Sequence, residues 1–462
     1  MEPWHFHDMS GGAFAILAGS ASDHQGRTQE LAQRSGPAQG TGQNRRSRTC
    51  ISRMNMKEAA KLSTGWTSGD SWKEPLLSTE SRLENRIPFN RPYMTGQELA
   101  FIEEAHHQGH LAGDGEFTRR CSQWLEAKTG AYGALLTHSC TAALEMASFL
   151  LELTPGDEVI MPSYTFVSTA NAVVSRGAIP VFIDVRSDTL NLNETLIEQA
   201  ISDRTRAIFV VHYAGVGAAM DEILKIASAH DLPVVEDAAQ GVMSTYKGRP
   251  LGTMGELGTL SFHETKNIIS GEGGALLCRD ETYFERAEIL REKGTNRSRF
   301  FRGQVDKYTW VDKGSSYLPG ELTAAFLWAQ MQHAESITSR RLSIWQTYHA
   351  WAERYEAGGV VRRPRVPEDC THNAHMYYLL LPSLKHRTAF IESLDNAGVG
   401  AVFHYVPLHS SPAGRRFGRQ SGDLQVTDDV ADRLVRLPLW VGLEPYMSRV
   451  LEAADSALDS WT

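Results

Sequence analysis

Short apolar segments alternate with helix-like segments between residues 134 and 277, and this rhythm limits the fold more than any other feature of the sequence. Segments with the length and composition of strands occupy residues 134–137, 157–161, 179–184, 207–212, 232–236, 259–262 and 274–277. Helices are predicted between the first five of them, at residues 142–153, 168–175, 193–200 and 220–230. Such alternation is typical of βαβ units, which form a parallel sheet with helices on both faces. The pattern therefore predicts an α/β domain with a mostly parallel seven-stranded sheet.

The sequence on either side of this region has a different character. Residues 326–462 mix helix-like and strand-like segments, which predicts a smaller C-terminal α+β domain after a large domain over residues 86–325. Residues 1–85 are polar and rich in small residues, a composition that buries too little apolar surface to offset chain entropy. We expect this segment to be disordered, or to be a non-native extension added by the choice of an upstream start codon.

Overall composition excludes several classes of function. The 462 residues carry a net charge of −9, which argues against a general nucleic-acid binder. The five cysteines are odd in number and lack CxxC spacing, which indicates a reducing compartment and no zinc site. No run of about 18 apolar residues and no secretory signal pattern occurs. We therefore expect a cytoplasmic protein without a metal, a membrane span or a nucleic-acid partner.

Polar clusters follow three of the predicted strands. They are Ser139–Thr141 after the first strand, Asp237–Gln240 after the fifth, and Ser261–Lys266 after the sixth. The carboxyl ends of parallel strands meet at one crevice, where open α/β sheets bind ligands. Each cluster also has a purely structural reading, as a helix cap or as solvated surface, but their order along the chain favours one shared site.

The residue types in these clusters suit pyridoxal phosphate chemistry. Lys266 can form an imine if burial lowers its pKa, and Asp237 can pair with a pyridinium nitrogen. Ser139–Thr141 lies at a strand–helix junction, where free amide groups favour an anion. Ser261 could add a hydrogen bond to a phosphate, and Phe166 could stack on a ring or pack in the core.

From about Ile87 to the C-terminus the chain resembles the sugar-nucleotide aminotransferases of the DegT/DnrJ/StrS group, which have the aspartate-aminotransferase fold (fold type I). The resemblance is carried by the stretches Gly113–Gly115, Ser139–Ala142, Gly156–Phe166, Val211–Gly215, Val235–Gly241, Ser261–Asn267, Arg291–Leu318 and Val402–His409.

The resemblance implies a role for each matching residue. Lys266 would bond covalently to pyridoxal 5′-phosphate and shuttle a proton, and Asp237 would keep the ring nitrogen protonated. Gln240 would lie near the phenolic oxygen and Phe166 would stack on the ring. The residues that would hold the phosphate are Ser139, Cys140, Thr141 and Ser261. Ser316 stands where the family has an asparagine that reaches the phosphate in a second subunit.

The implied reaction passes an amino group from L-glutamate to a dTDP-4-keto-6-deoxyhexose. The products would be 2-oxoglutarate and dTDP-4-amino-4,6-dideoxy-D-galactose, a precursor of cell-surface polysaccharide of the enterobacterial common antigen type. The resemblance also implies a homodimer in which both subunits line each site. Candidate substrate contacts are a basic loop with Arg297, Arg299, Arg302 and Lys307, alternatively a solvated surface loop, and His404, Tyr405 and His409 beside the sugar.

Three other functions are weighed against this one. The chain could aminate another nucleotide-linked ketosugar, a choice that its sequence discriminates poorly. It could be a sugar dehydratase of the same fold, but those enzymes carry histidine at the position of Lys266. It could also be a catalytically silent homologue, against which the intact set Asp237, Gln240, Ser261 and Lys266 argues.

Overall fold

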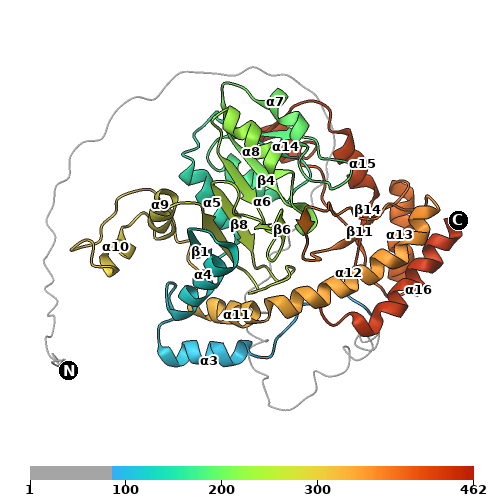
Figure 1. Cartoon of the computed structure of the whole chain (residues 1–462), viewed down its shortest axis with the longest axis horizontal. Coiled ribbons are helices and arrows are strands. Elements are labelled where there is room, and N and C mark those ends of the chain that lie inside the picture. The colour runs from blue at the N-terminus through green and yellow to red at the C-terminus, as the bar shows by residue number, and fades with distance from the viewer. Residues whose placement is uncertain (1–85, 462) are drawn as a thin grey trace, which may run out of the picture. The chain divides into compact units, whose positions relative to one another are not determined.

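The computed structural model describes residues 86–461, so the prediction made for residues 1–85 lies outside the described residues. A sheet with strand order β1-β9-β8-β5-β4-β2-β3-β13 forms the centre of this part of the chain (Figure 1). Its strands are β1 (Gly133–Thr137), β2 (Glu158–Pro162), β3 (Ile179–Ile183), β4 (Thr205–Val211), β5 (Val234–Asp237), β8 (Leu257–Ser261), β9 (Gly274–Cys278) and β13 (Arg419–Gln420).

The sheet is mostly parallel, because only β9 runs antiparallel to its neighbours β1 and β8. The predicted α/β fold is therefore confirmed, and all seven predicted strands are present. The sheet has one strand more than predicted, since β13 pairs in parallel with β3 at the edge. A strand of two residues leaves no periodic pattern in the sequence, which is why the prediction missed it.

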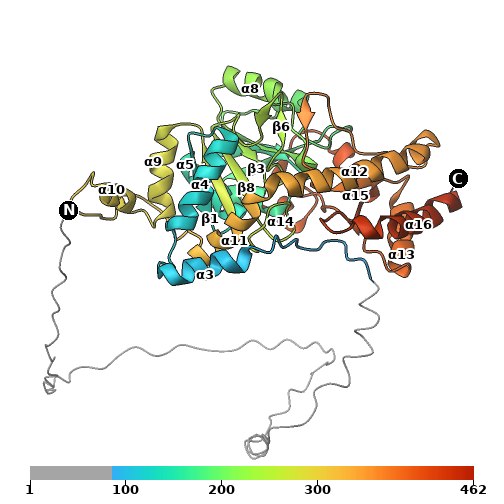
Figure 2. The same ribbon diagram turned by 60° about the horizontal axis from the view of Figure 1, so that its bottom comes forward.

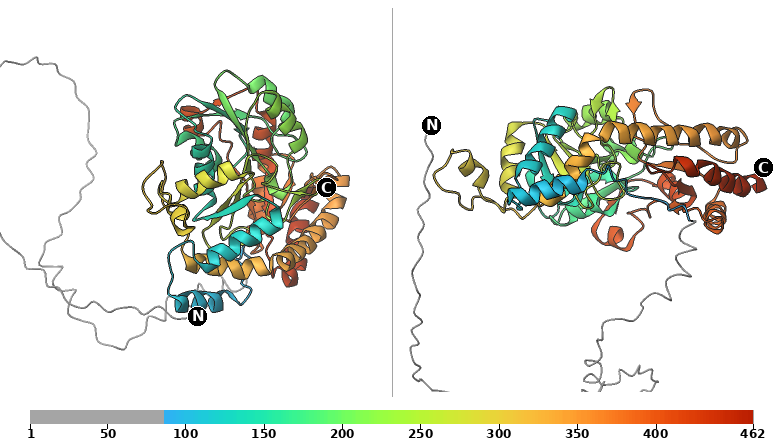
Figure 3. Two further views of the ribbon diagram at one scale, coloured as in Figure 1. Left: turned by 60° about the vertical axis from the view of Figure 1, so that its left-hand side comes forward. Right: turned by 90° about the horizontal axis from the view of Figure 1, so that it is seen from below.

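Helices cover both faces of this sheet, as Figures 1 and 3 show from several sides. One face packs against α3 (Glu98–Gln108), α4 (Glu116–Thr129), α7 (Ile197–Ala200), α8 (Met220–Ala229) and α11 (Glu321–Gln332). The other face packs against α5 (Cys140–Leu150), α6 (Val167–Val174) and α9 (Glu281–Arg291).

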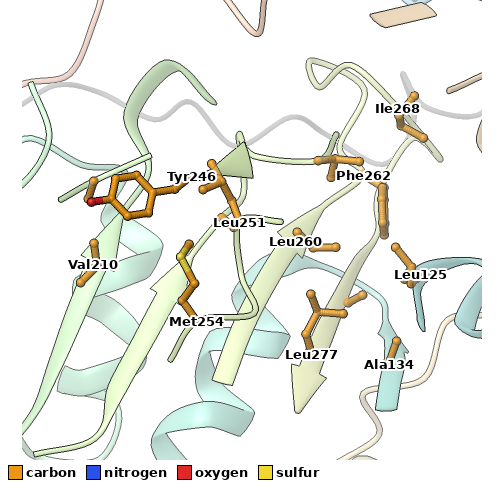
Figure 4. Packing of buried hydrophobic residues seen from close by; sticks show 14 of the residues in the cluster. Leu125, Ala134, Val210, Tyr246, Leu251, Met254, Leu260, Phe262, Ile268 and Leu277 are labelled. Carbon is orange, nitrogen blue, oxygen red and sulfur yellow. The ribbon is translucent and has the colours of Figure 1, made fainter. Parts of the chain in front are cut away.

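Strand residues alternate between these two cores, as the two-residue period of a strand requires. Leu136 belongs to the first core, while its neighbour Leu135 belongs to the second. Part of the first core is seen in Figure 4, where Leu260 and Leu277 extend from the adjacent strands β8 and β9 toward Leu125 of α4. Both faces of the sheet are therefore buried, which explains the almost continuous apolar runs of its strands.

The C-terminal part has its own core around a small antiparallel sheet. This sheet has the order β11-β14-β12 and consists of β11 (Tyr377–Leu380), β14 (Leu434–Leu437) and β12 (Val402–Phe403). The helices of this part are α12 (Ala334–Ala357), α13 (Leu384–Asn396), α14 (Pro412–Phe417), α15 (Gln425–Arg433) and α16 (Met447–Leu458). Helix α12 runs from the large sheet toward the C-terminal part (Figure 2). It contacts the first core through Ala334 and Ile337 and the C-terminal core from Ile344 onward.

Short elements complete the fold. A third sheet joins β6 (Thr245–Tyr246), β7 (Arg249–Pro250) and β10 (Cys370–Thr371), and α10 (Arg297–Phe301) lies in the segment predicted as a basic loop. Among residues 86–461, no helix combines the length and the apolar character that crossing a bilayer requires.

The fully buried carboxylate of Glu236, in β5, holds this strand in place through four hydrogen bonds. Glu236 Oε1 accepts backbone hydrogen bonds from Met254 and Gly255, at 2.5 and 2.7 Å. Its Oε2 accepts from the Gly252 N–H at 2.9 Å and pairs with His212 Nε2 at 2.8 Å. Because His212 Nδ1 accepts from a backbone N–H, its Nε2 carries the proton and donates to Glu236. These bonds join β5 to the turn before β8.

We expect Glu236→Gln to lower the free energy of unfolding by about 2–4 kcal/mol at pH 7, because its amide group would face backbone donors. Burial raises the pKa of Glu236, but the hydrogen bonds from His212, Gly255 and Gly252 outweigh it and hold this pKa below the ordinary 4.5. The carboxylate therefore stabilises the fold above pH 4.5, and this contribution is lost as the pH falls through the lower folded pKa.

Urea unfolding midpoints of both proteins across this pH range measure the effect. The difference between them should shrink as the pH falls below 4.5. Glu353→Gln is the matched control, because Glu353 is exposed and its effect should stay within about 0.5 kcal/mol. Equal effects of the two substitutions would contradict the role given to Glu236.

Candidate active site

A cavity of about 630 Å³ opens at the carboxyl edge of the large sheet. Its floor is built from the segments that directly follow β1, β2, β5 and β8, so the strand ends converge as the sequence predicts. The predicted cofactor contacts that line it are Ser139, Cys140, Thr141, Phe166, Asp237, Gln240, Ser261 and Lys266. The structure thus brings together every residue proposed for the cofactor.

One end of the cavity suits an anion. Helix α5 begins at Cys140, and the first N–H groups of a helix have no partner within it. Ser139 caps this helix, since its Oγ accepts from Ala142 N at 3.1 Å, and its own hydroxyl hydrogen remains free to donate. Gly274 of β9 packs against the start of this helix. Only glycine fits at this position, because a Cβ there would lie 2.4 Å from Cys140 N.

Hydroxyl groups add donors at the same end. Thr141 Oγ1 lies 2.7 Å from Ser168 Oγ, and both residues line the cavity. Ser261 Oγ accepts a long bond of 3.5 Å from the His263 N–H, which leaves its hydroxyl hydrogen to donate. Ser168 was not predicted, although its position in the first turn of α6 was a usable signal.

The acid of the site is held firmly at the end of β5. Asp237 is 5% exposed, and its Oδ2 accepts from Thr169 Oγ1 at 2.7 Å while its Oδ1 accepts from Ala239 N at 3.2 Å. No helix follows Asp237, so the alternative reading as a helix cap does not apply. Gln240 is fixed too, because its Oε1 accepts from Ala214 N at 2.7 Å and its Nε2 donates to the Tyr405 hydroxyl at 3.0 Å.

The lysine of the site has no partner. Within residues 86–461 the Lys266 ammonium makes no hydrogen bond or ion pair. Burial lowers the pKa of Lys266 below its ordinary value, and the positive charge of Arg436 lowers it further, against the influence of Cys140 and Asp237. Phe166 lies near the mouth of the cavity and is 57% exposed, so its ring is not core packing. The amine is therefore free to react, in a cavity that an exposed aromatic side chain also lines.

Only some of the residues proposed to contact the substrate line the cavity. His404 and Tyr405 line the cavity, and the left-handed backbone of Tyr405 has φ +33°. His404 Nδ1 lies 2.7 Å from the Tyr213 hydroxyl, and burial holds the pKa of His404 well below its ordinary value. His409 does not line the cavity; its Nδ1 lies 2.8 Å from Ser163 Oγ.

The basic loop lies away from the cavity of its own chain. Arg302 forms two bonds to the Glu288 carboxylate, at 2.7 and 2.8 Å, and Arg299 bonds to Glu285 at 2.7 Å. None of the loop residues predicted to contact substrate or cofactor lines this cavity: Arg297, Arg299, Arg302, Lys307 and Ser316.

Sequence reasoning missed three polar cavity residues from the C-terminal part: Arg341, His375 and Arg436. Arg341 donates from Nε and Nη2 to the carbonyls of Ala374 and His375, at 3.1 and 2.8 Å. His375 Nδ1 lies 3.0 Å from Asn267 Oδ1. The only signal for Arg436 was a single charge inside the apolar strand Leu434–Leu437.

The cavity fits pyridoxal 5′-phosphate on three observations. An unpartnered lysine with a lowered pKa suits the aldehyde, a buried and oriented carboxylate suits the ring nitrogen, and a helix N-terminus with hydroxyls suits the phosphate. Fold and site together define a pyridoxal-phosphate-dependent enzyme of the aspartate-aminotransferase fold.

Comparison with known proteins agrees with this class. Residues 92–454 match the model of the DegT/DnrJ/EryC1/StrS aminotransferase family. The chain is 38% identical over 364 residues to the uncharacterized protein MJ1066 of Methanocaldococcus jannaschii, covering 77% of this chain and 93% of that protein. It is 32% identical over 365 residues to the spore coat polysaccharide biosynthesis protein SpsC of Bacillus subtilis, covering 77% and 92%.

A solved structure shares the fold as well. Spr1654 of Streptococcus pneumoniae, in its PLP form, superposes with a TM-score of 0.75 at 25% identity, covering 82% of this chain and all of that one. The chain therefore belongs to the DegT/DnrJ/EryC1/StrS aminotransferase family. The predictions of an aminotransferase and of pyridoxal phosphate as its cofactor are confirmed.

Proposed function

We propose that the chain transfers the amino group of L-glutamate to the keto carbon of a dTDP-4-keto-6-deoxyhexose. The products are 2-oxoglutarate and dTDP-4-amino-4,6-dideoxy-D-galactose, for a surface polysaccharide of the enterobacterial common antigen type. The observation that carries an aminotransferase function is the free amine of Lys266 beside Asp237 in one cavity. The name of the relative SpsC supports a sugar substrate, and the resemblance over residues 291–318 and 402–409 supports this particular ketosugar.

The chain's own residues supply binding, orientation and proton transfer. Pyridoxal phosphate, when bound, supplies a ring that accepts the electron pair left by a broken C–H bond. Asp237, oriented by Thr169, keeps a proton on the ring nitrogen through its negative charge. Lys266 Nζ takes a proton from one carbon and returns it to another, and its lowered pKa increases the fraction of neutral amine near neutral pH.

We also propose a homodimer with shared active sites. Phe301, Tyr308 and Trp310 of the basic loop are between 53% and 77% exposed, and clustered apolar side chains of this kind mark protein interfaces. We propose that Arg297 and Lys307 bind the diphosphate of a substrate in the partner's cavity, because the loop does not line the cavity of its own chain.

We propose a cytoplasmic location for the same enzyme. Cys121, Cys140, Cys278 and Cys370 are free thiols, and free thiols are typical of a reducing compartment.

An absorbance titration of the purified holoenzyme tests the proposed reaction. We expect L-glutamate to bleach the visible band of the bound cofactor, and dTDP-4-keto-6-deoxyglucose, added next, to restore it. Each change reports one half of the transamination. A band that does not respond to glutamate would contradict the proposed donor, and a bleached band that the ketosugar leaves unchanged would contradict the proposed acceptor.

A further inference from the structure

Three histidines line the active-site cavity, and one of them carries an unused hydrogen-bond acceptor. They are His263, His375 and His404. His375 Nδ1 lies 3.0 Å from Asn267 Oδ1, and its Nε2 makes no hydrogen bond to any of residues 86–461. This Nε2 is not sealed inside the protein either, so it faces the cavity that His375 lines. A polar atom that is open to a binding cavity is available to a ligand.

The hydrogen bonds of Asn267 fix the position of the proton on His375. Asn267 Nδ2 donates to the carbonyl of Asn373 at 2.8 Å, which turns its Oδ1 toward His375. An amide oxygen only accepts, so His375 Nδ1 carries the proton and donates to it. Burial lowers the pKa of His375 well below its ordinary value, and the positive charges of Lys266 and Arg341 lower it further. The ring is therefore neutral at neutral pH, and its Nε2 presents a lone pair to the cavity.

The other two histidines of the cavity do not offer such an acceptor. His263 Nδ1 accepts from the Thr265 N–H at 3.2 Å, so its Nε2 carries the proton, 3.6 Å from a carboxylate oxygen of Glu272. His404 Nδ1 lies 2.7 Å from the Tyr213 hydroxyl, and because a hydroxyl both donates and accepts, this contact does not fix the proton of His404. His375 is therefore the cavity histidine whose contacts define an acceptor.

The backbone around His375 is held on two sides. Arg341 donates to the carbonyls of Ala374 and His375, at 3.1 and 2.8 Å. Asn373 Nδ2 donates to two carbonyls of the loop after β5, at 2.8 and 2.7 Å. Because the chain is fixed on both sides of the ring, Nε2 keeps one position in the cavity, as a group that discriminates between ligands must.

We propose that His375 Nε2 accepts a hydrogen bond from the 3-hydroxyl of the ketosugar and so helps to select the acceptor substrate. The inference rests on the proposed function and adds a specificity residue to it. The keto carbon C4 must lie at Lys266, which moves the proton of that carbon, and the next residue, Asn267, holds His375. The 3-hydroxyl is on the carbon next to C4, so it is the hydroxyl of the sugar closest to the reacting atom.

The amino-acid donor suits this acceptor less well than the sugar does. Both carboxylates of L-glutamate are ionised at neutral pH and carry only lone pairs, so they cannot donate to Nε2. Its amino group is consumed by the transfer itself. A sugar hydroxyl has a hydrogen to donate, and a site that bonds a substrate hydroxyl discriminates strongly against an analogue that lacks it.

Two substitutions separate the roles of the two ring nitrogens. His375→Asn keeps an N–H group near Nδ1 for Asn267 but ends before the position of Nε2, whereas His375→Gln reaches that position with an amide oxygen. We expect His375→Asn to raise the half-saturating concentration of dTDP-4-keto-6-deoxyglucose about tenfold, in single-turnover measurements on protein loaded with pyridoxamine phosphate. That of L-glutamate, measured on the pyridoxal phosphate form, should change less than about threefold. His375→Gln should restore most of the ketosugar affinity.

A modified substrate makes the test specific for one hydroxyl. Because dTDP-4-keto-3,6-dideoxyglucose lacks the 3-hydroxyl, wild-type protein should need about tenfold more of it for half-saturation than of the full ketosugar. His375→Asn should saturate with the two sugars within about twofold of each other, because the partner of the hydroxyl is already gone. His386→Asn makes the same chemical change in the C-terminal part, outside the cavity, and should behave as wild type.

Losses that add, so that His375→Asn still discriminates about tenfold between the two sugars, would overturn the inference. An equal or larger loss with L-glutamate would also overturn it, because it would assign Nε2 to the amino donor or to the shape of the cavity. A lower limiting rate with unchanged saturation would do the same, because it would make His375 a proton carrier. If wild-type protein loaded with pyridoxamine phosphate does not aminate the ketosugar at all, the proposed function fails and the inference fails with it. Failure of the inference alone leaves wild-type turnover intact.

Discussion

Replacing Lys266 with alanine should lower the rate of transamination by at least about 10³- to 10⁴-fold, because it removes the group that carries the proton between the two carbons. Its amine is the only cavity amine that combines a lowered pKa with freedom from partners in the described chain. The fold should survive, since the Lys266 side chain makes no hydrogen bond or ion pair that alanine would remove. Product formation by chromatography measures the loss, and circular dichroism checks the fold.

Two variants sharpen the Lys266 experiment. Lys266→Arg keeps a positive charge but cannot give up its proton near neutral pH, so it should be as inactive as the alanine variant. Lys247→Ala removes an exposed lysine that pairs with Asp221, and should leave the rate within about twofold. Substantial activity in Lys266→Ala, with the fold intact, would refute the assigned proton carrier.

Residues that follow strands of the parallel sheet could be placed from the sequence. Ser139, Asp237 and Ser261 each lie at or directly after such a strand, and strand ends of a parallel sheet meet at one edge whatever the loops do. Local pattern therefore carried three-dimensional information in this half of the chain.

The cavity residues that come from the C-terminal part could not be predicted in this way. Arg341 and Arg436 come from α12 and β14, far along the chain from Lys266, and reach the cavity through the packing of the C-terminal core. β14 was also hidden at the sequence level, because it begins at Leu434, directly after α15 ends at Arg433. Pairing with β11 and β12 makes this segment a strand rather than a continuation of α15.

The basic loop shows a different limit. Its charges predicted a phosphate contact, but charge alone does not say which chain a loop serves. In the structure Arg299 and Arg302 are partnered by Glu285 and Glu288 of α9. Placing the loop relative to a substrate therefore depends on the homodimer that we propose.

Asp237→Asn should lower turnover about 10²- to 10³-fold while the protein still folds. The substitution is nearly isosteric, and an asparagine oxygen can still accept from Thr169 Oγ1. What it removes is the negative charge that favours a protonated ring nitrogen. Without that proton the bound ring accepts electrons less well, so the proton transfer at Lys266 becomes slower. Single-turnover rates with L-glutamate measure this step.

Thr169→Val separates the charge of Asp237 from its orientation. This variant keeps the carboxylate charge but removes the hydroxyl that donates to Oδ2 at 2.7 Å. If charge dominates, Thr169→Val should lose only about tenfold, the effect of one buried hydrogen bond, while Asp237→Asn loses far more. Equal losses would mean that geometry matters more than charge, and wild-type rates in Asp237→Asn would refute the pairing with the ring nitrogen. Because neither substitution changes the size of the side chain much, unfolding midpoints close to wild type would assign the lost rate to the chemistry of the site.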